Sequence, residues 1–180
     1  LSRIKDKQAV LEELDYSPKR KLNKSLIFSL ASMNFLKAKQ NIIINGKTGC
    51  GKSFLAQALG NRAIHEGFTV YYIRTSTLLE EIKLSRIDGS YTNLVKRFAR
   101  YKLLILDDFG VSPISVDDAT NLFEIIEIRS QLSSTIITSQ LPVKDWYGYL
   151  QNNTVADAIL DRVVHSSHRI EIEGDSLRAK

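Results

Sequence analysis

The strongest constraint on how this chain folds is a glycine-rich run at positions 46–53, Gly-Lys-Thr-Gly-Cys-Gly-Lys-Ser. It fits the pattern G-x-x-x-x-G-K-[ST] without a deviation. An apolar run at residues 41–45 comes directly before it, and residues 52–63 have the composition of a helix. A glycine-rich turn between a buried strand and a helix N-terminus presents backbone N–H groups to an anion. The sequence therefore predicts a phosphate-binding loop that joins a strand to a helix.

Each residue type in this loop has a chemical reason. Glycine allows the backbone to turn tightly and to approach a phosphate without a Cβ clash. Lys52 supplies a compact positive charge for terminal phosphates, and the Ser53 hydroxyl is a suitable Mg²⁺ ligand. The residues predicted to contact a nucleotide in this loop are Gly46, Lys47, Thr48, Gly49, Cys50, Gly51, Lys52, Ser53 and Phe54.

A second polar site follows another apolar run. Residues 103–106 read as a buried strand, and Asp107 and Asp108 come directly after it. The carboxyl ends of parallel strands meet at one edge of a sheet, beside the phosphate loop. Asp107 is therefore predicted to hold Mg²⁺ together with Ser53, and Asp108 to polarise an attacking water. A further strand at residues 135–138 ends in Ser139-Gln140, which predicts polar groups near a terminal phosphate.

The rest of the chain alternates strand and helix patterns. Alternating buried strands and helices indicate a parallel sheet covered on both faces. We predict a three-layer α/β fold of the P-loop NTPase type, with a five-stranded parallel sheet, over residues 41–180. A helical segment is predicted to precede it over residues 1–40, with Ile4, Leu11 and Leu14 on one helical face. Helix starts are predicted from capping boxes at residues 77–80 and 115–118. The other predicted elements are strands at 69–74 and 169–172 and helices at 92–101 and 155–164.

Composition excludes several classes. The 180 residues include one cysteine, Cys50, so no disulfide framework is possible, and a reducing compartment fits best. No apolar run approaches the ~20 residues of a membrane span, so we expect a cytoplasmic protein without a membrane partner. His165 and His168 have no further ligands clustered with them, which argues against a zinc site.

The charge is unevenly divided along the chain. Residues 1–102 contain 19 Lys and Arg against 8 Asp and Glu, whereas residues 103–180 contain 6 against 12. Basic charge confined to one part of a chain is typical of a protein with a polyanionic partner. A solvated charged face without a partner explains the same composition equally well.

Several stretches together resemble the AAA+ ATPases. They are residues 41–53, residues 103–110 (LLILDDFG), residues 135–146 (TIITSQLPVKDW) and residues 157–165 (DAILDRVVH). Within the AAA+ ATPases, the chain looks like the bacterial helicase loaders and transposition helpers, and most like the IstB-type insertion-sequence ATP-binding proteins. The resemblance implies ATP and Mg²⁺ as cofactors. We expect no helical lid of the usual kind, because the chain ends soon after its fifth predicted strand, and this agrees with the loaders and helpers, where the lid is missing or vestigial.

The resemblance assigns roles that spacing alone does not. Gln140 falls at the sensor 1 position, and Arg162 falls where this clade carries an arginine finger that reaches the ATP of a neighbouring subunit. Arg178 resembles the sensor 2 position. Most AAA+ proteins have Glu where this chain has Asp108, which places water activation and turnover in question.

The clade also implies an extra helical insertion between the second and third strands. Here residues 74–102 contain seven basic and three acidic residues. We expect contacts with the DNA backbone, little sequence preference and strong salt dependence; the alternative is that these residues only solvate a helix. The candidate DNA contacts are Lys83, Arg86, Lys96, Arg97 and Arg100.

The expected function is that of an ATP-hydrolysing protein of the bacterial cytoplasm that assembles with further copies on DNA and assists a transposase. Two alternatives stay open. A helicase loader would have the same fold but would prefer single-stranded DNA. An ATP-gated DNA-binding scaffold with little turnover would fit Asp108 in place of Glu. A P-loop kinase is a more distant reading, because no acceptor-binding lid is visible.

Overall fold

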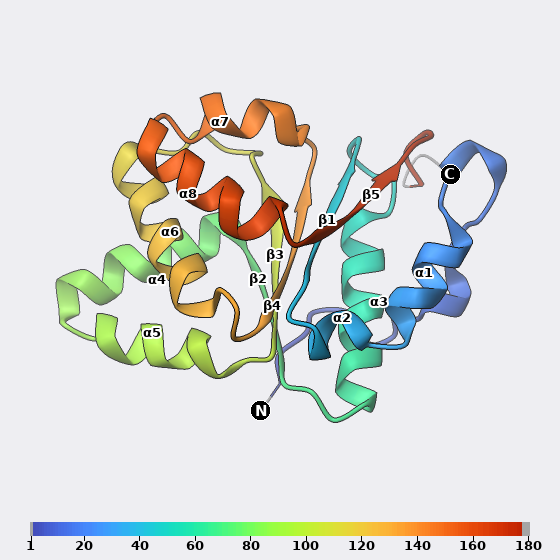
Figure 1. The fold of residues 1–180 in the computed structure, drawn as a ribbon, viewed down its shortest axis with the longest axis horizontal. Helices are drawn as coiled ribbons and strands as arrows, with labels where there is room; N and C mark the ends of the chain where they lie inside the picture. Colours follow the sequence, from blue (N-terminus) through green and yellow to red (C-terminus); the bar gives the residue numbers. More distant parts are fainter. Residues whose placement is uncertain (1, 178–180) are drawn as a thin grey trace.

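The computed structural model describes residues 2–177, and within them the sheet lies between two layers of helices (Figure 1). The sheet order is β2-β3-β4-β1-β5, and every neighbouring pair is parallel. This confirms the predicted α/β class and the five-stranded parallel sheet. The strands are β1 (Asn41–Gly46), β2 (Val70–Arg74), β3 (Leu103–Phe109), β4 (Ser134–Ser139) and β5 (Ser167–Ile172).

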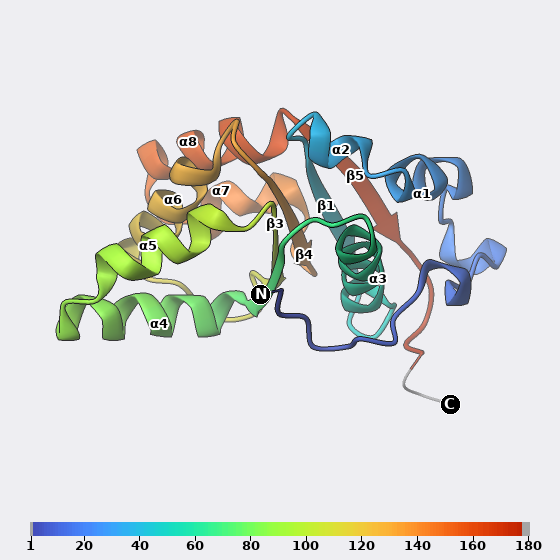
Figure 2. The same ribbon diagram turned by 90° about the horizontal axis from the view of Figure 1, so that it is seen from below.

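Helices cover both faces of the sheet. Viewed from below in Figure 2, α3 packs on one face of the central strands while α4 to α8 gather on the other. The first layer contains α1 (Lys24–Ala31), α2 (Asn34–Lys37) and α3 (Lys52–His65). The second contains α4 (Thr75–Asp88), α5 (Tyr91–Arg100), α6 (Val116–Arg129), α7 (Trp146–Tyr149) and α8 (Asn153–Val164). Three short 3-10 turns complete the described elements: η1 (Leu11–Glu13), η2 (Pro18–Arg20) and η3 (Val143–Asp145).

The strands are apolar on both faces because both faces are covered. In β3, Leu104 and Leu106 belong to the core under α4 to α8, whereas Leu103 and Ile105 belong to the core under α1 to α3. A strand buried on both sides reads as a continuous apolar run rather than an alternating one. This packing explains why residues 103–106 show no polar alternation.

The first 14 residues differ from the prediction. Ile4, Leu11 and Leu14 do not share a helix; only the short turn η1 forms there, and Arg3 lies extended beside β2. The Arg3 N–H donates to the carbonyl of Val70 at 2.8 Å, and its carbonyl accepts from Tyr72 at 2.7 Å. The segment thus pairs with an edge strand that would otherwise expose unpaired backbone groups.

One of the two predicted capping boxes is wrong. Helix α4 begins at Thr75 rather than near Thr77, and its N-cap residue Arg74 makes no side-chain cap bond. The helix starts earlier because the Thr75 hydroxyl donates to the carbonyl of Asp107, which fixes the first turn against β3. The second box is confirmed: Ser115 and Asp118 exchange side-chain and backbone bonds at the start of α6.

Across residues 2–177, none of the helices is long and apolar enough to cross a membrane.

Candidate nucleotide and metal site

The phosphate loop connects β1 to α3 as predicted. Gly49 and Gly51 have φ values of +77° and +103°, a region that residues with a Cβ rarely adopt, and Gly51 is the N-cap of α3. Among the predicted loop contacts, Lys47 and Thr48 are exposed, whereas Cys50 and Lys52 are buried. The remaining contacts are half-buried: Gly46, Gly49, Gly51, Ser53 and Phe54. The loop therefore leads into the N-terminus of a 14-residue helix, where unpaired N–H groups attract an anion.

The side chain of Lys52 bends back over this loop. Its Nζ donates to the carbonyl oxygens of Gly46 at 2.7 Å and Lys47 at 2.8 Å, and the residue is buried. These bonds keep the ammonium group beside the N–H groups at the start of α3. Positive charge and N–H donors thus converge on one point, as binding of a polyphosphate requires.

Asp107 is the centre of the polar site. Its Oδ1 accepts from Ser53 at 2.8 Å and from Thr138 at 2.5 Å, and its Oδ2 accepts from Tyr72 at 2.5 Å. The residue is only 2% exposed. Burying a carboxylate is costly unless it is hydrogen-bonded, and three hydroxyl donors offset that cost here. Residues of β2, β3, β4 and α3 thus fix the orientation of one carboxylate beside the phosphate loop.

Two of these partners were missed from the sequence. Neither Tyr72 nor Thr138 is marked by its local sequence as a partner of Asp107. Burial raises the pKa of Tyr72, and the neighbouring Asp107 carboxylate adds to the effect. The phenol therefore keeps its proton and acts as a donor to Asp107.

Asp108 lies in a different environment from Asp107. The ladder between β3 and β4 shifts register between Leu106 and Phe109, and Asp108 has a φ of +59°. Its N–H donates to the hydroxyl of Thr138 at 3.0 Å. Its side chain turns toward Arg74, with Oδ2 lying 3.6 Å from the Arg74 Nε. The bulge thus separates the two adjacent carboxylates, one buried on Ser53 and one partly exposed.

Gln140 lies directly beside the phosphate loop. Its Oε1 accepts from the Thr48 hydroxyl at 2.7 Å, across 92 residues of sequence. The neighbouring Ser139 hydroxyl instead donates to the carbonyl of Phe109 at 2.7 Å, inside the protein. The structure therefore brings the predicted sensor residue to the loop, while Ser139 stabilises the strand end.

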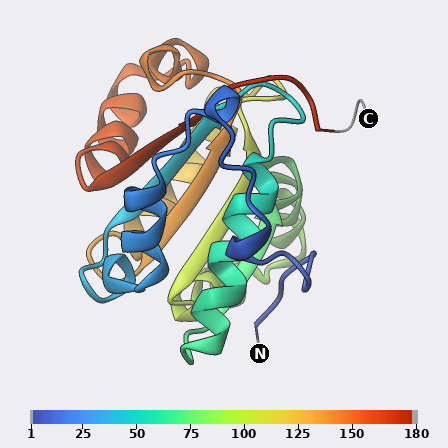
Figure 3. The same cartoon turned by 90° about the vertical axis from the view of Figure 1, so that its right-hand side faces the viewer.

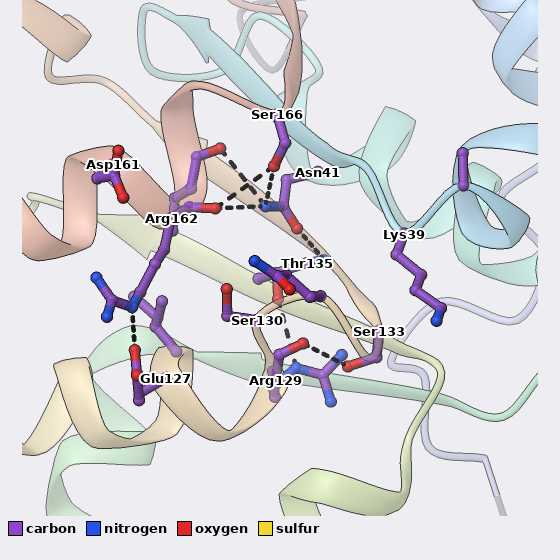
Figure 4. A pocket seen from close by; sticks show the side chains of 14 residues that line it. Lys39, Asn41, Glu127, Arg129, Ser130, Ser133, Thr135, Asp161, Arg162 and Ser166 are labelled. Carbon is purple, nitrogen blue, oxygen red and sulfur yellow. Dashed lines mark hydrogen bonds and ion pairs between the residues drawn. The ribbon is translucent and has the colours of Figure 1, made fainter.

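Arg162 lies away from this cluster, on α8 near the amino-terminal ends of the strands. It pairs with Glu127 of α6, and its guanidinium lies 5.1 Å from the centre of the Phe123 ring. Figure 4 shows it at a cavity of about 620 Å³ whose wall includes Asn41, at the start of β1, and Ser166, just before β5. Phosphates bind at the carboxyl ends of the strands. Arg162 therefore does not join the phosphate loop of its own chain.

The basic residues of α4 and α5 fall into two groups. Lys83 pairs with Asp118 at 3.0 Å, Arg86 with Glu124 at 2.8 Å, and Arg97 with Glu81. Lys96 and Arg100 are exposed and, among residues 2–177, have no carboxylate within ion-pair distance. Arg178, the predicted sensor 2 residue, lies outside the described residues.

The parallel sheet, the phosphate loop and the buried Asp107 have the arrangement of a P-loop nucleotide-binding domain. Two solved structures have the same fold. The AMPPCP-bound DnaA of Aquifex aeolicus matches with a TM-score of 0.77 at 21% identity, over 93% of this chain and 51% of that one. DnaI matches with a TM-score of 0.78 at 20% identity, over 92% of each chain.

The sequence places the chain more narrowly. It matches the family of IstB-like ATP binding proteins over residues 1–180, and it belongs to that family. It is 44% identical over 171 residues to the putative insertion sequence ATP-binding protein y4pL of Sinorhizobium fredii, covering 95% of this chain and 70% of that protein. It is 35% identical to the putative ATP-binding protein of insertion sequence IS232 from Bacillus thuringiensis, over 94% of this chain and 68% of that one.

Proposed function

We propose that this chain hydrolyses ATP, assembles with further copies on DNA in an ATP-dependent way, and assists a transposase. The observation that carries the proposal is the 2.8 Å hydrogen bond between Ser53 and Asp107 beside the phosphate loop. It brings a hydroxyl and a carboxylate oxygen to one point, and Mg²⁺ prefers such oxygen ligands. Ser53 and Asp107 thus fit a Mg²⁺ ion, which when bound offsets the negative charge of the phosphates.

The other residues of the site have separate tasks in this proposal. Lys52 and the N–H groups of the loop bind the phosphates. Asp108 orients and polarises the attacking water, since its partly exposed carboxylate is open to solvent. Gln140, held by Thr48, contacts the terminal phosphate. Tyr72 and Thr138 do not touch the nucleotide; they orient Asp107 through its two oxygens.

The position of Arg162 supports assembly. This arginine lies at the amino-terminal side of the sheet, away from the loop of its own chain, and in this proposal it acts on the ATP of a neighbouring copy. A ligand that binds only the assembled state shifts the equilibrium toward that state. ATP bound between two copies therefore stabilises the assembly, and hydrolysis releases it.

Two exposed cations of α5, Lys96 and Arg100, are better candidates for DNA contacts than the three basic residues of α4 and α5 that form ion pairs. Lys96 and Arg100 project from the last two turns of α5 and neutralise phosphates without breaking an ion pair. Lys83, Arg86 and Arg97 contribute less, because each must leave a carboxylate first. Contacts of this kind bind the DNA backbone and carry little sequence information.

A second function is favoured by one observation. Asp108 pairs with Arg74 and replaces the longer Glu of most AAA+ proteins. A carboxylate that faces an arginine is less free to contact the attacking water. On this reading the chain is an ATP-gated DNA-binding scaffold with little turnover.

The test is steady-state ATP turnover without DNA, with duplex DNA and with single-stranded DNA, using Lys52→Ala as the control. Stimulation by duplex that is lost in the Lys52 variant is the expected result. Preference for single strands would instead indicate a helicase loader. Nucleotide binding without turnover in every condition would favour the scaffold.

A further inference from the structure

The chain crosses the phosphate loop again after its last strand. Residues 173–177, here called the strap, follow β5 and lie against Gly49. The N–H of Leu177 donates to the carbonyl of Gly49 at 2.9 Å. A Cβ at position 49 would lie only 2.1 Å from the Ser176 Oγ, so the strap leaves room for glycine alone. Gly49 is thus constrained by the strap as well as by its place in the loop.

The side chain of Arg20 holds this strap. Its Nη1 donates to the carbonyl oxygens of Asp175 at 2.7 Å and Glu173 at 3.3 Å. Its own carbonyl accepts from the Glu173 N–H at 3.2 Å. Arg20 is 7% exposed although it stands in a short turn near the surface. In Figure 3 the dark red end of β5 meets a blue turn of the N-terminal region at the top of the view, which agrees with these contacts.

The turn that carries Arg20 is itself well defined. Asp15 Oδ2 accepts from the Arg20 Nε at 3.2 Å, and Asp15 Oδ1 accepts from the N–H of Ser17 at 2.9 Å. The bonds from Ser17 and Arg20 hold the pKa of Asp15 below its usual value, so the carboxylate stays charged. At Gly174, where φ is +94°, an added Cβ would lie 3.1 Å from the carbonyl oxygen of Lys19. The two segments are therefore in backbone contact.

We propose that Arg20 is a positioning residue for nucleotide binding, which holds the strap against Gly49 and so keeps the phosphate loop in its binding conformation. The strap bonds to the carbonyl of Gly49, so it consumes no N–H group that a phosphate needs. Gly49 has a φ of +77°, one of several conformations open to glycine. When the binding-competent conformation is only partly populated, apparent affinity falls by that fraction.

This inference rests on nucleotide binding by the phosphate loop, and it is tested by measuring ATP affinity. Arg20→Met removes the three side-chain bonds. Lys21→Met is the matched control, because the exposed Lys21 side chain also reaches the strap, through an ion pair with the Glu173 carboxylate at 2.8 Å. Calorimetric titration with ATP should show about tenfold weaker binding for Arg20→Met. Lys21→Met should stay within about twofold of the unmodified chain.

A second variant acts at the other end of the strap. Leu177→Pro removes the N–H that bonds to Gly49 and leaves Arg20 in place. It should weaken ATP binding to a similar extent, and it keeps the test decisive if Arg20→Met fails to fold. In both variants, hydrogen exchange in residues 173–177 should accelerate without nucleotide.

Three outcomes overturn the proposal. One is a lower unfolding midpoint of Arg20→Met with unchanged ATP affinity, which would assign Arg20 a merely structural role. The second is tighter ATP binding in either variant, which would make the strap an obstruction. The third is unchanged affinity in Leu177→Pro. If the unmodified chain itself binds no ATP, or binds it equally well as Lys52→Ala, the proposed function fails and the strap proposal fails with it.

Discussion

The phenol of Tyr72 donates a 2.5 Å hydrogen bond to Oδ2 of Asp107, opposite the oxygen that accepts from Ser53 and Thr138. This bond crosses from β2 to β3 inside the protein. It occupies the carboxylate oxygen that does not face Ser53. Asp107 is therefore held from both sides, and its Oδ1 is directed at the hydroxyl that starts α3.

Tyr72→Phe tests whether this bond orients the proposed metal ligand. Phenylalanine keeps the packing and leaves Oδ2 of Asp107 without its donor, a loss of about 1.5–3 kcal/mol for a bond to a charged group. We expect the Mg²⁺ concentration that gives half-maximal ATP binding to rise several-fold, while ATP binding in EDTA changes little. Fluorescence titration with a labelled ATP analogue measures both.

Tyr71→Phe is the matched control for this experiment. The Tyr71 hydroxyl accepts from Arg3 at 3.0 Å and lies on the other face of β2, away from Asp107. Its loss should leave the Mg²⁺ dependence unchanged. Equal Mg²⁺ dependence in the two variants would mean that Tyr72 only packs.

Asp108→Asn tests the proposed role in water activation. Asn tolerates the φ of +59° at this position at least as well as Asp, whereas Ala would add backbone strain. The change removes the charge and keeps the local fold. If Asp108 polarises the attacking water, ATP turnover falls by about 10²–10⁴ and ATP affinity is preserved. Turnover that survives the change would place water activation on another group.

The alternation of side chains along the strands explains part of what the sequence could predict. In a strand, residues two apart share a face, and the register aligns Tyr72 with Ile105 and Ile105 with Ile136. Asp107 comes two residues after Ile105, and Thr138 comes two residues after Ile136, so both lie on the same face as Tyr72. This is the face that α3 covers. The alternation within each strand can be read from the sequence. The strand order is also needed to see that Tyr72 and Thr138 lie on either side of Asp107.

Other features are absent from any local pattern. The ion pairs of Lys83 and Arg86 join α4 to residues 35 and 38 positions away in α6, so the five basic residues looked alike in sequence. The extended segment around Arg3 depends on an open strand edge rather than on its own apolar spacing. Both features therefore depend on contacts between residues distant in sequence. The phosphate loop and Asp107, in contrast, could be predicted from the residues next to them in the chain.

Arg162→Ala tests whether this arginine acts across an interface. Turnover per subunit should fall by about 10³ or more at concentrations that allow assembly, because a finger stabilises transition-state charge to that extent. ATP binding to dilute protein should stay unchanged. Arg62→Ala, which removes an exposed arginine of α3, is the matched control.

Mixing two inactive variants makes the same test sharper. Lys52→Ala retains Arg162, and Arg162→Ala retains the phosphate loop. A mixture of the two should recover part of the turnover, since some interfaces then pair an intact loop with an intact arginine. A mixture as inactive as its components would show that Arg162 does not act on the ATP of a neighbouring copy.

The exposed cations of α5 should contribute more to DNA binding than the paired cations of α4. Each phosphate contact contributes about −0.9 to the slope of log affinity against log salt on duplex DNA. Replacing Lys96 and Arg100 together by alanine should reduce that slope by about 2. Replacing Lys83 and Arg86 should change it less, because both are already paired. Filter binding across a salt series measures the slopes, and an equal loss in the two double variants would mean that the α4 pairs open on DNA.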